Sequence, residues 1–151
     1  MPHETIFTII NISVLPAWIL LMFAPRWVWT RRIVHAAFFP LLFGAFYTYF
    51  LIINVFFGGS AEGTSLFSLA GVMAFFDTPT GALVGWSHYL VFDLFVGAWI
   101  SRDAIEREIN YSLVLPCLFF TFMLGPVGLM LYLLLRLLSG KGGLALGPQA
   151  T

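Results

Sequence analysis

Charged residues are scarce in this chain. Asp, Glu, Lys and Arg make up 9% of its 151 residues, whereas a soluble domain usually carries about 25%. Hydrophobic residues make up 60%, so much of the surface must face lipid. The seven basic and seven acidic residues cancel, which leaves no basic field to attract nucleic acid. The composition therefore predicts an integral membrane protein with the lipid bilayer, and no nucleic acid, as a partner.

Cysteine is almost absent, and so is positive charge near the N-terminus. Cys117 is alone, which excludes an intrachain disulfide and a cysteine metal cluster. Its apolar neighbours favour a packing role. Residues 1–5 contain no Lys or Arg, whereas a cleaved signal peptide begins with a basic segment. We therefore expect the first apolar run to be retained as a membrane span.

Four apolar runs are long enough to cross a bilayer, whose core of about 30 Å needs about 20 helical residues. They are residues 6–23, 33–57, 82–100 and 113–138. They end at Pro25, at Gly58-Gly59-Ser60, at Ser101-Arg102-Asp103 and at Ser139-Gly140-Lys141-Gly142. The pattern predicts an all-α, polytopic transmembrane helical bundle of about four spans. We expect a single domain over residues 1–139 and a flexible, Gly-rich tail over residues 140–151.

Residues 65–76 are apolar but form a shorter run, which Asp77-Thr78-Pro79 ends. A run of about 12 residues favours a short interfacial or re-entrant helix over a span.

Lys and Arg in short loops indicate orientation. With four spans, five arginines share one side, and Arg136 and Lys141 share the other. If residues 65–76 also spanned, the count would again be five against two. Charge bias thus leaves four and five spans open, but it places the first inter-helix loop in the cytoplasm in both cases.

Polar groups inside apolar runs are candidate functional residues because they are costly in lipid. The third run contains Trp86, His88, Tyr89 and Asp93. Trp86, Tyr89 and Asp93 share one helical face with Gly97, where a second helix could approach closely. His88 lies about 140° around the helix from Asp93. The two therefore cannot stack on one face, although both can border one pocket between helices.

Two interpretations of this third run stay open. In the first, Asp93 and His88 form an acid/base pair that acts on a lipid-soluble substrate. In the second, Asp93 bonds to Asn54, a tyrosine or an arginine and fixes the bundle. Arg102, about 40° from the face of His88, would reach a polar head of a substrate. The Gly-Pro break at residues 124–129 either lines a cavity or is a packing kink.

Histidine is scarce as well, which argues against haem and metal. His35 begins the second run at its cytoplasmic end, while His88 lies near 18 Å deep in the third. His3 precedes the first run on the other side. Two axial ligands at similar depth are therefore missing, and we expect no metal and no cofactor.

A resemblance to a known family adds to this interpretation. Trp86-Ser87-His88, Phe92-Asp93-Leu94-Phe95 and Trp99-Ile100 with Arg102-Asp103 resemble the central signature of the plant ABA-deficient-type membrane proteins. Pro126-Val127-Gly128-Leu129 is similar to the break in that family's last span. The resemblance covers about residues 5–138. In plants this family is required for making neoxanthin, an allenic carotenoid, from the epoxide violaxanthin.

The resemblance implies an epoxide-to-allene isomerisation that needs an acid and a base but no redox cofactor. His88 and Asp93 match the family's His and Asp and are the candidate catalytic residues, with their roles left open between them. The implied ligand is a hydrophobic carotenoid or isoprenoid. The candidate substrate-binding residues are Trp86, Tyr89, Asn54, Trp99, Arg102 and Asp103.

The sequence lacks an Arg- and Ser-rich transit extension, so we expect a bacterial inner-membrane protein of carotenoid or isoprenoid metabolism. One alternative is a non-catalytic pigment- or lipid-binding subunit of a membrane complex. A second is a small transporter component, against which the lack of a charged relay counts. Whether the chain forms homo- or hetero-oligomers stays open.

Overall fold

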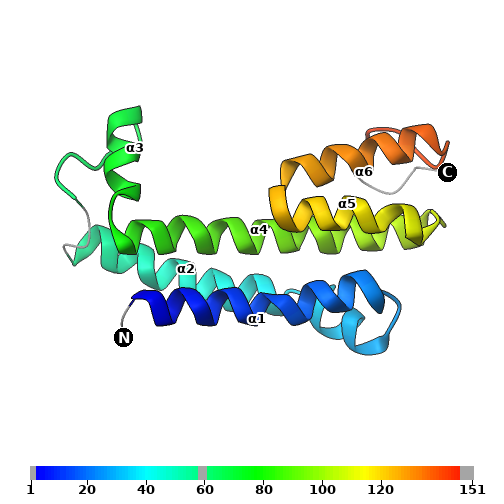
Figure 1. Cartoon of the computed structure of the whole chain (residues 1–151), viewed down its shortest axis with the longest axis horizontal. Coiled ribbons are helices and arrows are strands. Elements are labelled where there is room, and N and C mark those ends of the chain that lie inside the picture. The colour runs from blue at the N-terminus through cyan, green and yellow to red at the C-terminus, as the bar shows by residue number, and fades with distance from the viewer. Residues whose placement is uncertain (1–2, 58–60, 147–151) are drawn as a thin grey trace. The chain divides into compact units, whose positions relative to one another are not determined.

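The computed structural model describes residues 3–57 and 61–146, and all regular structure in these ranges is helical. In chain order the elements are α1 (His3–Phe23), the π-helical turn η1 (Thr30–Val34), α2 (Phe38–Phe56), α3 (Leu69–Phe76), α4 (Pro79–Glu106), α5 (Tyr111–Leu124) and α6 (Pro126–Leu138) (Figure 1). The predicted all-α class is confirmed. Gly58-Gly59-Ser60, expected to end the second apolar run, lies outside the described residues.

The chain divides into two compact units. Unit 1 comprises residues 1–15 and 37–91, and therefore contains α2 and α3. Unit 2 comprises residues 16–36 and 92–151, and contains η1, α5 and α6. The long helices α1 and α4 each contribute their first part to unit 1 and their second part to unit 2.

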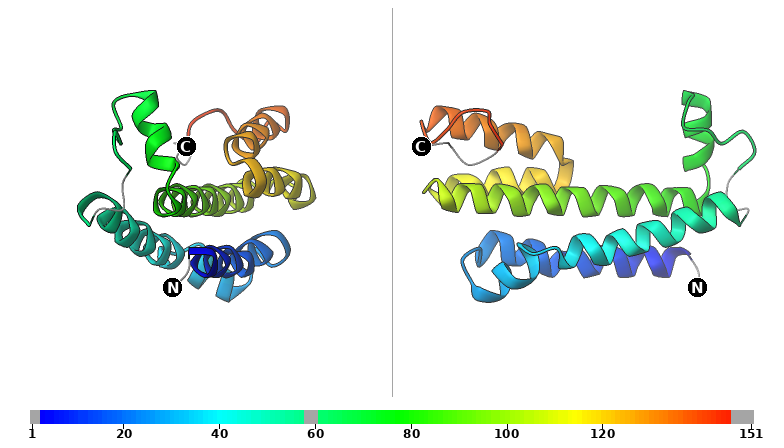
Figure 2. Two further views of the ribbon diagram at one scale, coloured as in Figure 1. Left: turned by 60° about the vertical axis from the view of Figure 1, so that its left-hand side comes forward. Right: turned by 180° about the vertical axis from the view of Figure 1, so that it is seen from behind.

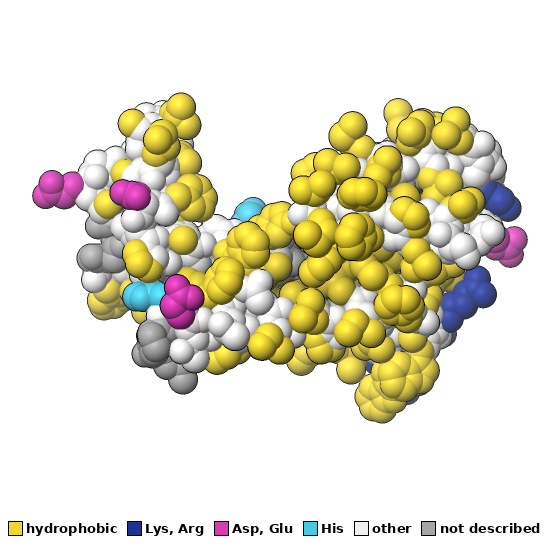
Figure 3. All heavy atoms as spheres, in the orientation of Figure 1, with side chains coloured by type: hydrophobic (Ala, Val, Ile, Leu, Met, Phe, Trp, Pro, Cys, Tyr) yellow, Lys and Arg dark blue, Asp and Glu magenta, His cyan; other side chains and the backbone are white. Residues whose placement is uncertain are grey.

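Among the described residues, three helices are long and apolar enough to cross a membrane, namely α1, α2 and α4. They contain 21, 19 and 28 residues. At 1.5 Å per residue, α4 is about 42 Å long and exceeds the hydrocarbon core. Hydrophobic side chains cover much of the face drawn in Figure 3, as is typical of a surface in contact with lipid.

Local sequence signals explain where α3 and α4 begin. The Ser68 hydroxyl accepts a hydrogen bond from Gly71 N at 3.1 Å and caps α3. The Thr78 hydroxyl accepts one from Gly81 N at 3.0 Å, and Pro79 occupies the first helical position, where its missing N–H is not needed. The structure thus confirms a short helix before Asp77. Its eight residues are too few to cross a bilayer.

The fourth apolar run is not one helix, so the prediction of a continuous span over residues 113–138 is wrong. α5 and α6 pack against each other as an antiparallel hairpin (Figures 1 and 2). The chain reverses at Gly125, whose φ of 43° is rarely adopted by L-residues, and Pro126 starts α6. Gly128 lies against Thr121 and the carbonyl of Cys117. With 14 and 13 residues, each helix is only about 20 Å long.

The hairpin also corrects the predicted distribution of charge. The Arg136 guanidinium, which is fully buried, pairs with Asp103 at 3.2 Å, and Arg107 donates to the carbonyl of Lys141 at 3.0 Å. Arg136 and Lys141 therefore lie at the same end of unit 2 as Arg102 and Arg107, not on the opposite side. Figure 3 shows basic side chains gathered at this end. The correction arises because α6 returns the chain to the end at which α5 began.

Part of the glycine-rich tail makes defined contacts in unit 2. The carbonyls of Gly143 and Ala145 accept hydrogen bonds from Arg136 Nη2, the latter at 2.7 Å. The carbonyl of Leu146 accepts one from Trp99 Nε1 at 3.3 Å. Residues 147–151, the rest of the segment expected to be flexible, lie outside the described residues.

Candidate functional site

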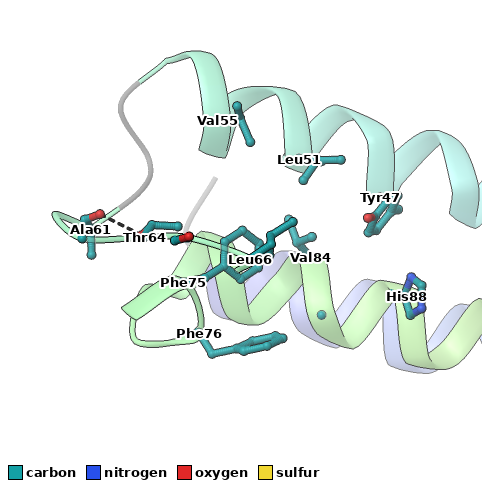
Figure 4. A pocket seen from close by; sticks show the side chains of 13 residues that line it. Tyr47, Leu51, Val55, Ala61, Thr64, Leu66, Phe75, Phe76, Val84 and His88 are labelled. Carbon is teal, nitrogen blue, oxygen red and sulfur yellow. Dashed lines mark hydrogen bonds between the residues drawn. The ribbon is translucent and has the colours of Figure 1, made fainter. Parts of the chain in front are cut away.

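Unit 1 contains a cavity of about 650 Å³ (Figure 4). This volume lies within the range of roughly 300–1,000 Å³ that is typical of small-molecule sites. The lining comes from three helices and one loop: Tyr47, Leu51 and Val55 of α2, Ala61 and residues 63–66, Phe75 and Phe76 of α3, and Val84, Gly85 and His88 of α4. The lining is mostly apolar and aromatic, so the cavity suits an apolar ligand.

The helical register explains how these side chains reach the cavity. Tyr47, Leu51 and Val55 follow one another at intervals of four residues, which puts them on one face of α2. On α4, Gly85 lies under the ring of Phe76, and a Cβ atom at position 85 would collide with that ring. The missing side chain at Gly85 therefore lets α3 pack closely and close one wall of the cavity.

His88 and Tyr47 are the pair that brings chemistry to this cavity. Their ring centroids are 5.6 Å apart with an interplanar angle of 54°. Figure 4 shows both side chains between α2 and α4 at one end of the lining. His88 is exposed, so a ligand can reach its imidazole. A neutral imidazole can accept a proton, and a phenol hydroxyl can donate a hydrogen bond to an oxygen.

Trp86 and Tyr89 occupy a different face of α4. Trp86 Nε1 donates to Asn11 Oδ1 at 3.1 Å. The Trp86 ring lies 5.6 Å from that of Phe7 and 5.3 Å from that of Tyr89. The contacts with Asn11 and Phe7 join α4 to α1, whereas His88 lies beside Tyr47 of α2. The structure therefore does not bring Trp86 and Tyr89 into the cavity beside His88.

Asp93 belongs to unit 2 and is 8% exposed. Its carboxylate lies so close to Gly125 that a Cβ atom there would collide with Oδ1. Gly125 directly precedes α6, and a helix start has unsatisfied N–H groups and a positive dipole end that favour an anion. Asp93 thus stabilises the turn of the hairpin. It is not among the residues that line the cavity, so the predicted pairing with His88 stays a prediction.

The neighbouring Gly97 admits a close approach, as its position on the predicted face suggested. A Cβ atom at Gly97 would lie 2.5 Å from Cη2 of Trp18, a buried residue of α1. Trp18 in turn packs on Phe122 of α5 at a centroid distance of 5.3 Å. The small residue therefore fixes how α1 packs within unit 2.

The remaining predicted substrate-binding residues contact other protein groups. Asn54 is fully buried in α2. Trp99 packs edge-on against Tyr132 at 5.7 Å. Arg102 donates to the carbonyl of His35 at 3.3 Å. Asp103 is 7% exposed and accepts hydrogen bonds from Arg107, Tyr132 and Arg136. The last three predicted residues therefore lie near the end of α4, in unit 2.

The sequence interpretation missed Tyr47, Phe75 and Phe76. The four-residue spacing from Tyr47 to Val55 was a signal, but the same spacing is typical of any lipid-facing helix stripe. Across residues 3–57 and 61–146, no three His, Cys, Asp or Glu side chains are grouped so that they could hold a metal ion.

A comparison with protein families identifies the chain's relatives. A family model described as ABA DEFICIENT 4-like matches residues 5–132, most of the chain. The chain belongs to the ABA DEFICIENT 4-like family. The match begins in α1 and ends within α6, so the cavity, His88 and Asp93 all lie inside the ABA DEFICIENT 4-like region. Comparisons with curated proteins and with solved structures give no match.

Proposed function

We propose that this ABA DEFICIENT 4-like protein acts in carotenoid or related isoprenoid metabolism and holds an isoprenoid ligand in the cavity of unit 1. The observation that carries the proposal is the apolar cavity with a single His–Tyr pair, His88 and Tyr47, at one end. Membership of the family supports the carotenoid class of ligand.

The lining fits one end of such a ligand. Aromatic walls formed by Phe75 and Phe76 suit a ring or a conjugated segment. A polar oxygen on the ring would meet Tyr47 and His88. A cavity of about 650 Å³ holds an end group, and the rest of a long isoprenoid would extend along the helices into lipid.

The finer proposal is an epoxide-to-allene isomerisation at this end group. A hydrogen-bond donor polarises the epoxide oxygen while a base removes a vinylic proton. The C–H electrons form the second double bond of the allene and the C–O bond opens. The oxygen takes a proton from the donor and becomes a hydroxyl, and the donor recovers a proton from the protonated base. The product is an isomer, so no oxidant or reductant is consumed. Tyr47 suits the donor and His88 the base.

One observation favours a non-catalytic pigment binder as the second candidate. Asp93, the predicted partner of His88, is not among the cavity residues, which leaves His88 and Tyr47 as the candidate chemical groups. A binder would use the same pair to orient a ligand through its oxygen without converting it.

Pigment analysis tests both versions. The chain is expressed in a host that supplies epoxy-carotenoids, and extracted pigments are compared for the wild type, His88→Ala, Tyr47→Phe and the control His3→Ala. We expect an allenic product from the wild type and His3→Ala, and a loss of at least about a hundredfold with His88→Ala. An unchanged pigment profile with the wild type contradicts the isomerase. Pigment that co-purifies unchanged would then support the binder.

The topology can also be proposed in finer detail. We infer that α1, α2 and α4 cross the membrane and that the α5–α6 hairpin enters and leaves on one side, because each of its helices is shorter than the bilayer core. All basic residues then share the cytoplasmic side, as the positive-inside rule favours. They are Arg26, Arg31, Arg32, Arg102, Arg107, Arg136 and Lys141.

A further inference from the structure

A second cavity, of about 470 Å³, lies in unit 2 between the segment that joins α1 to α2 and the last turns of α4. Its polar lining consists of Arg26, Arg31, His35, Arg102 and Glu106. Three guanidinium groups against one carboxylate leave the pocket positively charged. The proposed isoprenoid site does not involve this pocket.

Hydrogen bonds fix the segment that forms one wall. The buried hydroxyl of Thr30 donates to the carbonyl of Ala24 at 2.7 Å. Arg31 N donates to Trp27 O at 3.1 Å, and His35 N donates to Thr30 O at 2.9 Å across the π-helical turn. Such turns are frequent at functional sites. Arg31 and His35 are therefore presented to the pocket by a defined backbone.

Arg102 links this wall to α4. Its Nη1 atom donates to the carbonyl of His35 at 3.3 Å, which anchors one side of the guanidinium. Arginine carries five N–H donors in a planar guanidinium group, and Arg102 lines the pocket, so its other donors can bind a ligand there. Arg26 and Arg31 are exposed and can move to meet a ligand.

His35 provides an independent sign of a ligand. Its Nε2 atom is buried and has no hydrogen-bond partner among the described residues. Burial, with the positive charges of Arg102 and Arg31, lowers the pKa of His35 to about 4, so the imidazole is neutral at pH 7. A buried polar atom without a partner is costly. A neutral imidazole with its proton on Nε2 can donate to an oxygen of a bound anion.

We propose that this pocket binds a phosphate group, supplied by the headgroup of an anionic phospholipid. The planar guanidinium group of arginine can donate two parallel hydrogen bonds to the oxygens of one phosphate group. Basic pockets between helices on the cytoplasmic side of membrane proteins bind such headgroups. The exposed rings of Trp27 and Trp29, in the same segment, are typical of the membrane interface. Pro25 and Ile105 add an apolar edge where the acyl chains would leave.

Binding by the purified chain in a neutral detergent tests the proposal, because a micelle without charge lacks the general attraction of an anionic bilayer. Short-chain phosphatidylglycerol and phosphatidylcholine are titrated and counted by native mass spectrometry, and inorganic diphosphate is titrated by thermal shift. The test variant is Arg26→Gln/Arg31→Gln. The matched control, Arg32→Gln/Lys141→Gln, removes two charges from the same end at positions outside the pocket lining.

We expect phosphatidylglycerol to bind at least about tenfold tighter than phosphatidylcholine, whose choline cation would face the arginines. The test variant should weaken phosphatidylglycerol binding by about tenfold or more, since each basic group contributes about fivefold, and the control by less than about twofold. Equal losses in both variants, or equal binding of both lipids, would overturn the site. Arginine-dependent binding of diphosphate without phosphatidylglycerol would overturn the lipid source and assign a soluble phosphate.

Discussion

Asp103 is the carboxylate whose removal should destabilise unit 2 most. It is 7% exposed. Its Oδ2 atom accepts hydrogen bonds from the hydroxyl of Tyr132 at 2.5 Å and from Arg136 Nη1 at 3.2 Å. Arg107 Nε lies 2.9 Å from both carboxylate oxygens. The network joins the end of α4 to α6, and the Arg136 side chain within it is fully buried.

The magnitude follows from what each substitution leaves behind. Asp103→Ala leaves the charge of Arg136 buried without its carboxylate, which costs about 3–5 kcal/mol. Tyr132→Phe removes one hydrogen bond to a charged group and costs about 1.5–3 kcal/mol. At about 2–4 °C per kcal/mol for a chain of this size, Asp103→Ala should lower Tm by about 6–20 °C.

Thermal unfolding in detergent measures these losses. The control is Glu106→Ala, which removes an exposed carboxylate from the same end of α4 and should shift Tm by less than about 2 °C. A Tm for Asp103→Ala equal to that of the control would refute the structural role. Loss of pigment binding by Asp103→Asn at an unchanged Tm would instead support the prediction that Asp103 binds substrate.

Three further outcomes are expected. Gly125→Ala should cost more than about 1 kcal/mol because of its φ of 43° and its contact with Asp93, and adding Asp93→Ala should recover part of that loss in a double-mutant cycle. Tm should fall as the pH is lowered from 7 to 5, and it should fall less in His35→Gln. The pKa of His35 in the folded chain is about 4, below its ordinary value of 6.5. The unfolded chain therefore binds more protons in this pH range, which destabilises the folded state. Single cysteines at Arg32 and Ser139, in a background without the native cysteine, should be labelled from the same side of the membrane.

Each of these expectations has a result that would contradict it. Strict additivity at positions 93 and 125 would mean that the two residues do not interact. A pH dependence that is identical in His35→Gln would assign the effect to another group. Labelling of positions 32 and 139 from opposite sides would restore a fourth span.

Local signals in the sequence predicted that the short apolar run ends at Asp77-Thr78-Pro79, and α3 does end at Phe76. α4 begins at Pro79, three residues before the predicted start at residue 82. Thr78-Pro79 is a capping residue followed by a residue that suits the first helical turn, and the observed helix begins there. His88 could also be identified as a candidate from the sequence, because burying a polar side chain in lipid without a partner has a high free-energy cost.

The reversal at Gly125 could not be predicted in the same way. Hydropathy counts apolar residues and cannot tell a kinked helix from two helices that turn back on each other, and the sign of φ is not visible in the sequence. The predicted separation of Arg136 from Arg102 was wrong for this reason. Its ion pair with Asp103, 33 positions earlier, exists because the hairpin brings α6 back to the end of α4.

The cavity depends on packing between distant segments. Tyr47 meets His88 because α2 and α4 lie together in unit 1, and α3 closes the wall because Gly85 leaves room for Phe76. Nothing in the alternation of apolar residues along α2 separates its cavity face from its lipid face. The candidate site could therefore be predicted only at His88.

The central claim is that the cavity of unit 1 holds an isoprenoid ligand, and filling the cavity tests it most directly. Leu51→Trp places an indole in the cavity lining, while Leu41→Trp makes the same change on α2 at a side chain that is 71% exposed. Carotenoid that co-purifies from a pigment-producing host is quantified by absorbance for variants of matched Tm. We predict at least about a tenfold loss of bound carotenoid for Leu51→Trp and unchanged binding for Leu41→Trp. Full retention by Leu51→Trp, or equal loss in both, would contradict the claim.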